Sequence, residues 1–380
     1  MLDNSSNNFE LTAKTFHGLE KVLASEIKKI GASDIKILKR AVSFKGDLKV
    51  IYKANYLVRT ALSILLKIKT FKAKTSDELY EEAKKINWED YIKIDETFVI
   101  SSTVYSTFHT HSHFAALKVK DAIADLFNEK YDKRPSIDTK EPDKRINLHV
   151  YEDNCTISID TSGDALFKRE YRRDTDVAPL NEVLAAGMVM LSDYKGIDFF
   201  YDPMCGSGTI LIEAARIFLN IPPAYSRKKF GFMKFLNYDY KIWNAVKRDA
   251  EKAILDETSV KFIGTDISDK VISIARRNIG NARLRNYIKI QTKDFINSKF
   301  ENQKGLIITN PPYDIRLKSN NINKLYKDIG DTLKHGFKGW SSYIFSGNLG
   351  AVKHIGLKPS QKIDLYNGKI ECKLLKYDIF

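Results

Sequence analysis

The pattern of hydrophobic and polar positions along the chain changes near residue 165. Before that point, segments such as FELTAKT, TFVISSTVY and RINLHVY alternate like half-buried strands, whereas GLEKVLASEIKKIG and HFAALKVKDAIADLFNEK have the periodicity of helices. The β-α-β-β-α order of the first segments is typical of a ferredoxin-like unit. We therefore predict a ferredoxin-like unit over residues 1–70 and a second α+β unit over residues 71–164.

From about residue 180 the pattern becomes a repeated alternation of strand and helix. IDFFYD, KFIGTD, YIKIQT and GLIITN read as strands, with helices such as TILIEAARIFL and SDKVISIARRNI between them. Such an order is typical of a parallel, doubly wound sheet, in which ligands bind beyond the carboxyl ends of the strands. WSSYIFSGN is expected to be the fifth strand, and KIDLYNGKIECKLLKYDIF a hairpin with its turn at Asn367-Gly368. Residues 165–380 are therefore predicted to form one α/β domain.

Polar side chains stand at the ends of four predicted strands. Asp202 ends the first, Asp266 ends the second, Asp294 follows the third and Asn310 ends the fourth. Asp266 stands where an acidic residue can accept hydrogen bonds from two ribose hydroxyls. One carboxylate alone could equally cap a helix, but carboxylates at three successive strand ends indicate a ligand site at this edge of the sheet.

The segment YDPMCGSGTILIEAA follows the first strand and contains a glycine loop. Gly206 and Gly208 permit positive φ and a close approach of the backbone to a ligand, and Thr209 can begin a helix with free amide groups. The absence of a GxxxxGK[ST] sequence argues against a nucleoside triphosphate, and only two glycines of the dinucleotide fingerprint are in place. The glycines alone leave the ligand open.

The fourth strand stops abruptly in LIITNPPYDIRL. Proline lacks an amide hydrogen and fixes its own φ, so a strand cannot continue through Pro311 and Pro312. A strand stop followed by a turn would also explain the two prolines. Together with the glycine loop and Asp266, however, the rigid segment indicates that Asn310 and Tyr313 are held still for a ligand.

The motifs DPMCGSGTILIEAA, GTDIS and TNPPYD resemble those of class I S-adenosylmethionine-dependent methyltransferases, in particular the amino-methylating branch with its [ND]PP[YFW] signature. The segment DTSGDALFKREYRRDTDVAPLNEVLAAGMV and the N-terminal units resemble the THUMP-containing RNA guanine-N2 methyltransferases, especially the bacterial enzymes for large-subunit rRNA. The resemblance covers nearly the whole chain. It implies a Rossmann-like domain, with a mostly parallel sheet and a C-terminal antiparallel hairpin, preceded by a ferredoxin-like unit and a THUMP domain.

This resemblance implies methyl transfer from S-adenosylmethionine to the N2 amino group of a guanine in RNA, with 23S ribosomal RNA as the expected substrate. A tRNA guanine or the N6 amino group of adenine stays open, because Asn-Pro-Pro-Tyr serves both bases. A non-catalytic RNA-binding or ribosome-assembly factor also stays open, although the intact Asp202, Asp266 and Asn310 argue against it.

The resemblance also implies roles for single residues. An exocyclic amino nitrogen is a poor nucleophile because its lone pair is delocalised into the ring. The side-chain carbonyl of Asn310 and the main-chain carbonyl of Pro311 can accept its two N–H groups, with Pro312 keeping the segment rigid. Tyr313 can stack on the extruded base. Cys205 is expected to be a small packing residue rather than a methyl-carrying nucleophile. The residues expected to bind the cofactor are Asp202, Pro203, Cys205, Gly206, Gly208, Asp266, Ile267, Asp294 and Asn310.

Composition favours a polyanionic partner. The 380 residues include 62 Lys+Arg against 48 Asp+Glu, which gives a formal net charge of +14 and a pI near 9.3. A solvated basic surface would give the same values unless the charge is clustered. Three cysteines without CxxC spacing, no leader and no membrane-spanning run lead us to expect a soluble cytoplasmic protein.

Basic residues do cluster in three segments. KREYRR lies at the junction of the predicted domains, and YSRKKFGFMKF interleaves cations with aromatic residues that could stack on unpaired bases. RRNIGNARLRNYIK is more simply explained as the solvated face of a helix. The expected RNA contacts are Lys168, Arg169, Arg172, Arg173, Arg227, Lys228 and Lys229.

The segment FHTHSHF places His109, His111 and His113 at alternate positions. On a strand they would share one face, as a zinc site requires. The segment leads into a helical pattern, however, and the proposed chemistry needs no metal because the sulfonium leaving group is already activated. We therefore expect a loop at a helix start, close to phosphate, and no metal.

Overall fold

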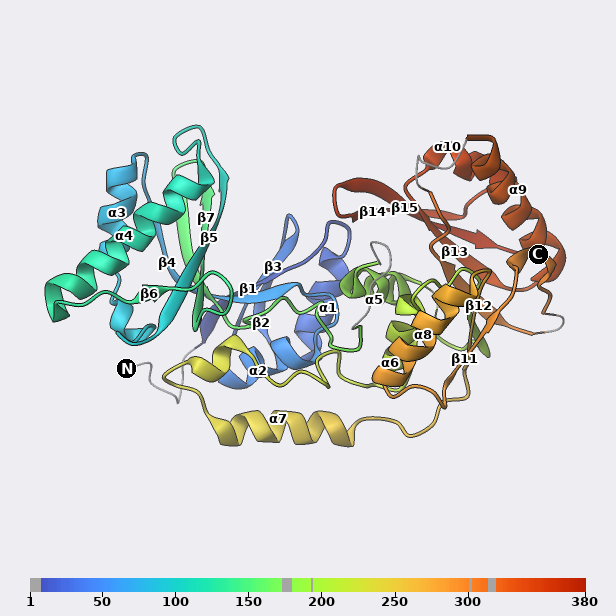
Figure 1. Ribbon diagram of the computed structural model, residues 1–380, viewed down its shortest axis with the longest axis horizontal. Helices are drawn as coiled ribbons and strands as arrows, with labels where there is room; N and C mark the ends of the chain where they lie inside the picture. Colours follow the sequence, from blue (N-terminus) through green and yellow to red (C-terminus); the bar gives the residue numbers. More distant parts are fainter. Residues whose placement is uncertain (1–7, 173–179, 193, 301–302, 314–318) are drawn as a thin grey trace.

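The computed structural model describes residues 8–172, 180–192, 194–300, 303–313 and 319–380. They form two sheets, one in each half of the chain (Figure 1). No helix within these ranges is both long and apolar enough to cross a membrane. The N-terminal half contains β1 (Phe9–Lys14), α1 (Glu20–Lys29), β2 (Ser33–Leu38), β3 (Ala41–Gly46), α2 (Leu48–Leu57), β4 (Ser63–Lys72), α3 (Ser76–Lys84), β5 (Thr97–Tyr105), α4 (Ser112–Tyr131), β6 (Ser136–Ile137), β7 (Lys144–Tyr151) and β8 (Asn154–Asp160). The C-terminal half contains α5 (Glu182–Leu191), β9 (Phe199–Asp202), α6 (Thr209–Phe218), α7 (Tyr240–Lys252), β10 (Lys261–Asp266), α8 (Asp269–Asn281), β11 (Ile288–Thr292), β12 (Gly305–Thr309), α9 (Ser319–Gly336), β13 (Ser341–Ser346), α10 (Leu349–Val352), β14 (Gln361–Asn367) and β15 (Ile370–Asp378).

The N-terminal sheet is continuous across the two predicted units. Its strand order is β2-β3-β1-β4-β8-β7-β5-β6, and β4 pairs antiparallel with β8, where Leu65 lies opposite Asp160. Local sequence fixes the helix starts: the Asp47 side chain caps α2, and Thr75 and Glu78 form a capping box at α3. The predicted strands FELTAKT, TFVISSTVY and RINLHVY are confirmed as β1, β5 and β7.

The C-terminal sheet has the strand order β11-β10-β9-β12-β13-β15-β14. Its first five strands run parallel, while β15 pairs antiparallel with β13 and β14, which confirms the predicted parallel sheet with a C-terminal hairpin. The predicted turn is wrong by one residue. Asn367 still belongs to β14 and pairs with Ile370, so the loop residues are Gly368 and Lys369. Gly368 has φ +63°, which glycine adopts without strain.

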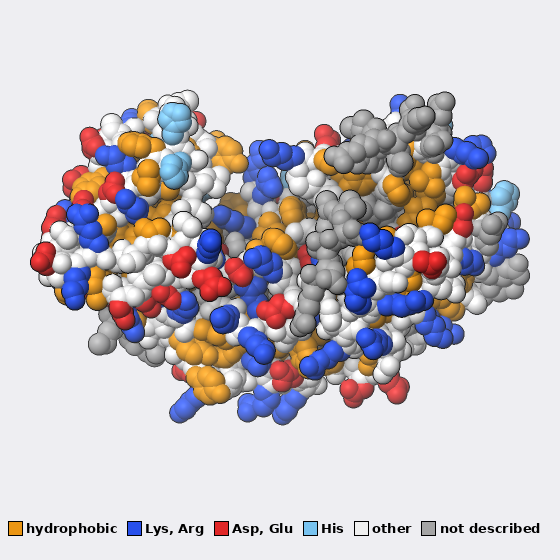
Figure 2. All heavy atoms as spheres, viewed as in Figure 1, with side chains coloured by type: hydrophobic (Ala, Val, Ile, Leu, Met, Phe, Trp, Pro, Cys, Tyr) orange, Lys and Arg blue, Asp and Glu red, His pale blue; other side chains and the backbone are white. Residues whose placement is uncertain are grey.

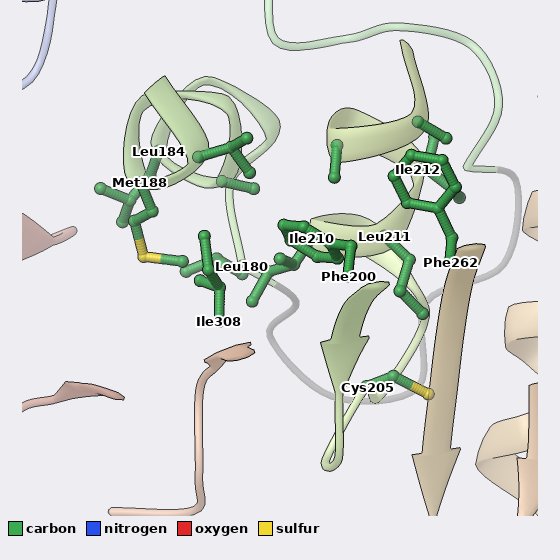
Figure 3. Packing of buried hydrophobic residues seen from close by; sticks show 14 of the residues in the cluster. Leu180, Leu184, Met188, Phe200, Cys205, Ile210, Leu211, Ile212, Phe262 and Ile308 are labelled. Atoms are coloured by element: carbon green, nitrogen blue, oxygen red, sulfur yellow. The ribbon is translucent and has the colours of Figure 1, made fainter. Parts of the chain in front are cut away.

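Both faces of the C-terminal sheet are covered, as expected for a doubly wound sheet. Alternate residues of β9 and β12 point to opposite faces: Phe200 and Ile308 pack with α5, α6 and α8, whereas Tyr201 and Ile307 pack with α9. Figure 3 shows Met188 of α5 beside Ile308 within the first of these two cores. Because the helices bury the apolar residues within the strands, the polar residues of these strands lie at the strand ends.

Residues 224–250 leave the C-terminal sheet and pack against the N-terminal half, with α7 alongside α2 (Figure 1). The rings of Phe230, Phe232 and Trp243 are buried, and the Phe232 ring centroid lies 4.5 Å from that of Tyr52 in α2. The prediction that the aromatic residues of YSRKKFGFMKF stack on RNA bases is therefore wrong for Phe230 and Phe232, because their rings form part of the core between the two halves.

Candidate active site

The polar residues predicted at the strand ends meet at one edge of the C-terminal sheet. Asp202 is the last residue of β9, and Asp266 is the last residue of β10, which runs parallel beside it. Asn310 directly follows β12, the other parallel neighbour of β9. Three adjacent strands therefore bring these side chains to the same edge, where ligands of such sheets bind.

The glycine loop after β9 is fixed by hydrogen bonds to β10. The amide of Cys205 donates to the carbonyl of Thr265 at 2.9 Å, and the amide of Gly206 donates to Oδ2 of Asp266 at 3.1 Å. Gly206 and Gly208 have φ of +53° and +82°, in the left-handed region that glycine tolerates. Gly208 immediately precedes α6, so the loop leads directly into a helix amino terminus.

Asp266 anchors this loop and keeps acceptor capacity for a ligand. Its Oδ1 accepts a hydrogen bond from the amide of Ser268 at 3.0 Å, and its Oδ2 accepts the one from Gly206. A carboxylate has about four lone-pair positions, so Asp266 can still accept two hydroxyl hydrogen bonds. This is the arrangement predicted for a ribose.

Asp202 is buried at the end of β9, and its Oδ1 accepts a hydrogen bond from the amide of Met204 at 3.3 Å. Burial raises the pKa of the Asp202 carboxyl to about 7, and the nearby charge of Asp266 acts in the same direction. A cationic ligand group at this point would stabilise the ionised form. Asp202 is therefore suited to the amino end of a cofactor such as S-adenosylmethionine.

The other predicted cofactor residues surround the loop. The carbonyl of Pro203 accepts a hydrogen bond from the Thr265 hydroxyl at 3.1 Å, Ile267 is exposed, and Asp294 caps the short 3-10 turn that follows β11. Cys205 belongs to the buried cluster in Figure 3, and burial raises the pKa of its thiol well above the usual range. A buried, protonated thiol is a poor nucleophile, which supports the packing role predicted for Cys205. Contacts of Pro203, Ile267 and Asp294 with the cofactor stay predictions.

The Asn-Pro-Pro-Tyr segment presents an unpaired acceptor. Oδ1 of Asn310 is buried, and within the described part of the chain it accepts no hydrogen bond. Leaving such a group unpaired is unfavourable by about 1–3 kcal/mol. Because Pro311 and Pro312 hold the backbone rigid, the carbonyl of Asn310 is fixed in position for a donor that a ligand can supply.

Tyr313 is held by the C-terminal hairpin. Its hydroxyl accepts a hydrogen bond from Nδ2 of Asn367 at 2.7 Å, and its ring meets Phe345 of β13 edge-on, with centroids 6.5 Å apart. The sequence identified Asn367 only as a turn residue. No local pattern indicates a contact between residues 54 positions apart in the chain.

The basic segment at the domain junction is partly structural. The side chain of Lys168 is 59% exposed, with Nζ 3.7 Å from Oδ2 of Asp164. Arg169, by contrast, is buried, pairs with the buried Glu213 of α6 and donates to the carbonyl of Arg59. The prediction that Arg169 contacts RNA is wrong, because its guanidinium is enclosed between the two halves.

Arg172 lies beside the start of α6. Its Nη2 donates to the carbonyl of Leu180 at 2.9 Å and to the hydroxyl of Thr209 at 2.8 Å, and it lies 3.4 Å from the carboxylate of Glu182. Arg172 thus supports the helix that follows the glycine loop. Its contact with RNA stays a prediction, and Arg173 lies outside the described residues.

Arg227 binds the main chain just before the basic segment at the domain junction. Its guanidinium is buried and donates to the main-chain carbonyls of Ser162 at 3.0 Å and Asp164 at 2.6 Å. The prediction that Arg227 contacts RNA is therefore wrong, since main-chain carbonyls already bind the donors that a phosphate would need.

Lys228 and Lys229 are exposed, but they lie away from Asn310. Helix α6 begins at the carboxyl ends of the parallel strands, where Asn310 lies, and runs antiparallel to them. The residues that follow α6 therefore lie toward the amino ends of the strands. There Lys228 lines a groove of about 460 Å³ together with Lys247 and Arg283. Whether these cations bind RNA stays a prediction.

The histidine segment forms a loop and the start of α4, as predicted, rather than a strand. His109 is buried with its Nε2 2.9 Å from the carbonyl of Ala73, whereas His111 and His113 are exposed. The three imidazoles therefore do not share a face. Over the ranges that the structure describes, no group of three or more His, Cys, Asp or Glu side chains could hold a metal ion.

The strand-end residues are compatible with S-adenosylmethionine. The backbone beside Gly206 is open, since a Cβ built there would meet no atom within 4 Å. Asp266 has lone pairs left for the ribose, and the buried Asp202 offers a carboxylate to the cationic methionine end.

Three family descriptions match successive parts of the chain: the RlmL ferredoxin-like domain over residues 10–65, the THUMP domain over 73–160, and the RMKL-like methyltransferase domain over 169–376. A putative RNA methyltransferase of Synechocystis sp. is 34% identical over 369 residues, which cover 97% of this chain and 96% of that protein. A ribosomal RNA large subunit methyltransferase K/L of Syntrophotalea carbinolica is 35% identical over 374 residues, which cover 95% of this chain and 52% of that protein. The chain therefore spans about half the length of this K/L relative.

Several solved structures are similar over nearly the whole chain. A putative methyltransferase in complex with SAH has a TM-score of 0.90 at 28% identity, with 99% of both chains covered. A predicted N6-adenine-specific DNA methylase from Listeria monocytogenes has a TM-score of 0.87 at 30% identity, with 98% of this chain and 97% of that chain covered. By its matching domains, its fold and the residues at its strand ends, the chain belongs to the family of RMKL-like methyltransferases that carry a ferredoxin-like and a THUMP domain before the catalytic domain.

Proposed function

We propose that this protein methylates the exocyclic N2 amino group of a guanine in large-subunit ribosomal RNA, with S-adenosylmethionine as the methyl donor. The K/L relatives, which are named for that RNA, support the choice of substrate, although this chain spans about half their length. The observation that carries the proposal is the buried, unpaired Oδ1 of Asn310 at the carboxyl edge of the catalytic sheet.

Asn310 and Pro311 align the reacting nitrogen. The amino nitrogen of guanine must direct its lone pair out of the ring plane before it can attack a methyl group. Two acceptors that hold both N–H groups favour that geometry, and Oδ1 of Asn310 and the carbonyl of Pro311 belong to consecutive residues of the rigid segment. Because Asn310 is neutral, it accepts a hydrogen bond without adding charge to the site.

The glycine loop, Asp202 and Asp266 would hold S-adenosylmethionine, which supplies a methyl group on an already activated sulfonium. The protein therefore needs no strong base to start the reaction. Its task is to bind and orient: Asp266 fixes the loop through Gly206, and the carboxylate of Asp202 lies at the end of the adjacent strand.

Tyr313 positions the base. Its ring is half-buried and is fixed from two sides, by the hydrogen bond from Asn367 and by the edge contact with Phe345. Because the Tyr313 ring is already fixed, stacking a base on it costs little side-chain entropy, which makes the stacking more favourable.

We further propose that residues 1–70, 71–164 and 165–380 act as the ferredoxin-like, THUMP and methyltransferase domains, and that the first two bind structured RNA. Lys168, Arg172, Lys228 and Lys229 remain candidates for phosphate contacts. A cytoplasmic location follows from the proposed ribosomal substrate.

Adenine N6 is the second candidate target, and one observation favours it: the similar structure from Listeria monocytogenes is named as a predicted N6-adenine-specific DNA methylase. An adenine amino group would present the same pair of N–H donors to Asn310 and Pro311. The choice between the bases therefore needs chemical identification of the product.

The experiment is methylation of RNA by the full-length protein. Deproteinised 23S rRNA and tRNA from a strain lacking the gene are incubated with methyl-labelled S-adenosylmethionine, digested to nucleosides and analysed by mass spectrometry. We expect labelled N2-methylguanosine in 23S rRNA. Labelled N6-methyladenosine, or label confined to tRNA, would overturn the corresponding part of the proposal. Failure to bind S-adenosylmethionine in calorimetry would favour a non-catalytic scaffold.

A further inference from the structure

Four aromatic side chains are exposed at one end of the THUMP region. Tyr105 is 61% exposed, Phe108 47%, Phe114 50% and Tyr151 64%. Single exposed apolar residues are common on proteins, but four large exposed rings at the same end of one domain indicate an interaction site. We call these four residues the aromatic end.

Strand topology places the four residues at the same end of the sheet, with Tyr105 and Tyr151 on the sheet face opposite to α4, which carries Phe114. Strands β4, β5 and β7 all point the same way, because β8 is antiparallel to both β4 and β7 while β5 is parallel to β7. Tyr105 and Tyr151 are the last residues of β5 and β7 and lie opposite each other. Phe108 follows in the loop after β5, and Phe114 lies in the first turn of α4.

The loop that carries Phe108 is fixed rather than loose. The hydroxyl of Ser106 donates to the carbonyl of Glu152 at 2.7 Å and accepts from the amides of Phe108 and His109 at 3.0 and 3.1 Å. Thr107 donates through both its amide and its hydroxyl to the Glu152 carboxylate. The imidazole of His109 lies 2.9 Å from the carbonyl of Ala73. The histidine motif thus builds a loop that presents Phe108 to solvent in a fixed position.

Cations lie beside two of the rings. Nζ of Lys74 is 5.6 Å from the Phe108 ring centroid, and Nζ of Lys118 is 5.7 Å from that of Phe114. Lys118 also lies 3.4 Å from Asp77 at the start of α3. The carboxylate of Glu152 next to this loop accepts hydrogen bonds from Thr107. Rings with adjacent cations match the bases and phosphates of a single-stranded nucleic acid.

The aromatic end lies on the same side of the molecule as the catalytic hairpin. Figure 1 places the β5–α4 connection at the top of the N-terminal half and the β14–β15 hairpin at the upper left of the catalytic half, where it projects toward the N-terminal half. Figure 2 shows hydrophobic and histidine side chains at the top of the N-terminal half, and a notch between the two halves. An RNA molecule that contacts both the aromatic end and the catalytic half would lie across this notch.

We propose that the aromatic end stacks on unpaired nucleotides next to the methylated site and so positions the RNA for the catalytic half. This inference rests on the proposed RNA substrate and adds a preference for a single-stranded segment. It assigns a role to Tyr105, Phe108, Phe114 and Tyr151 that is separate from the stacking on Tyr313. The FHTHSHF motif then supports base stacking instead of a metal.

The test uses the full-length double variant Phe108→Ala, Phe114→Ala and fluorescence anisotropy with two probes, a ten-nucleotide oligoadenylate and a blunt-ended RNA hairpin. Base stacking is worth on the order of 1–3 kcal/mol per ring, or roughly fivefold or more in Kd. The double variant should therefore bind the oligoadenylate at least about tenfold more weakly and the hairpin within about twofold. The salt slope should not change, because stacking releases no counterions. Tyr240→Ala, which removes an exposed ring on α7, is the matched control and should bind both probes like the wild type.

Leucine variants separate stacking from simple apolar contact. Phe108→Leu, Phe114→Leu keeps the apolar volume but not the flat ring, so it should lose oligoadenylate affinity like the alanine variant. Unchanged affinity of the alanine variant, or full affinity of the leucine variant, would overturn the proposal. So would a wild-type dimer that the alanine variant converts to monomer, because the aromatic end would then bind a second copy of the chain. If oligoadenylate binding is lost as expected but no RNA is methylated, the proposed function fails, and of this inference only the stacking on unpaired nucleotides stands.

Discussion

Neighbouring residues Lys168 and Arg169 should respond to substitution in opposite ways. Both are cations in the same basic segment, and the sequence predicts the same role for both. In the structure the Arg169 side chain is 1% exposed and pairs with Glu213, which is 0% exposed, whereas the Lys168 side chain is 59% exposed. Arg169→Ala should therefore destabilise the fold, and Lys168→Ala should weaken RNA binding.

The change in the free energy of unfolding expected for Arg169→Ala depends on Glu213, the buried partner that remains. Removal of the Arg169 side chain leaves the carboxylate of Glu213 buried, with the hydroxyl of Tyr171 as a hydrogen-bond donor at 3.0 Å. Breaking a buried pair in this way typically lowers the free energy of unfolding by about 3–5 kcal/mol. We expect about 3 kcal/mol, because the charges of Arg59 and Arg216 also interact favourably with Glu213. Lys168→Ala should change the free energy of unfolding by no more than about 1 kcal/mol.

The assay is urea unfolding followed by tryptophan fluorescence, together with RNA affinity measured against salt. The three tryptophans report on different cores: Trp88 on the THUMP region, Trp243 on the packing of α7 against α2, and Trp340 on the catalytic sheet. Lys168→Ala should flatten the slope of log affinity against log salt by about 0.7–0.9, whereas Arg169→Ala should leave it unchanged under conditions where the variant is folded. An Arg169→Ala protein as stable as the wild type, with a flatter salt slope, would refute the structural role.

Three further predictions concern the site itself. Asp266→Ala should weaken S-adenosylmethionine binding roughly 100-fold or more in calorimetry, because the ribose hydroxyls lose a charged acceptor and the loop loses its anchor; unchanged affinity would place the cofactor elsewhere. Burial raises the pKa of Asp202 to about 7, so between about pH 4 and pH 7 the folded state holds a proton that the unfolded chain has lost. Without cofactor, this proton makes the free energy of unfolding fall as pH rises through this range. The buried Asp160, with its pKa raised to about 6, acts in the same direction, so Asp202→Asn should make the fall shallower without abolishing it; the same pH dependence in the wild type and the variant would contradict the assignment. Asn367→Ala removes the hydrogen bond to Tyr313, worth about 1 kcal/mol, so turnover should fall roughly fivefold at unchanged cofactor affinity. Tyr313→Phe should have the same effect, and wild-type turnover in both variants would show that the bond does not position the base.

The strand-end residues could be predicted from sequence because their positions follow from local signals. A β-branched run ended by Asp266, or by Asn310 and two prolines, fixes both the end of a strand and the side chain that stands there. The parallel order then brings these ends together without any knowledge of packing. The same reasoning placed the hairpin correctly but missed its register by one residue, because Gly368 can occupy either position of a two-residue turn.

The burial of the basic residues could not be predicted, because it depends on partners distant in the chain. Arg169 is enclosed by Glu213, 44 positions away, and by the carbonyl of Arg59, 110 positions away. Arg227 binds carbonyls more than sixty positions earlier. The residue type alone does not show whether an arginine has such a distant partner and is buried, or is exposed. For the same reason the packing of residues 224–250 against the N-terminal half could not be predicted.

The most direct test of the account is the turnover of Asn310→Ala measured together with its affinity for S-adenosylmethionine. If the unpaired Oδ1 of Asn310 aligns the amino group, turnover on RNA should fall by roughly 10²–10³ while the cofactor Kd stays within about twofold of the wild type. Asn310→Asp keeps an acceptor at this position and should retain more activity than the alanine variant. Near wild-type turnover of Asn310→Ala, or a loss of activity caused entirely by weaker cofactor binding, would contradict the role assigned to Asn310.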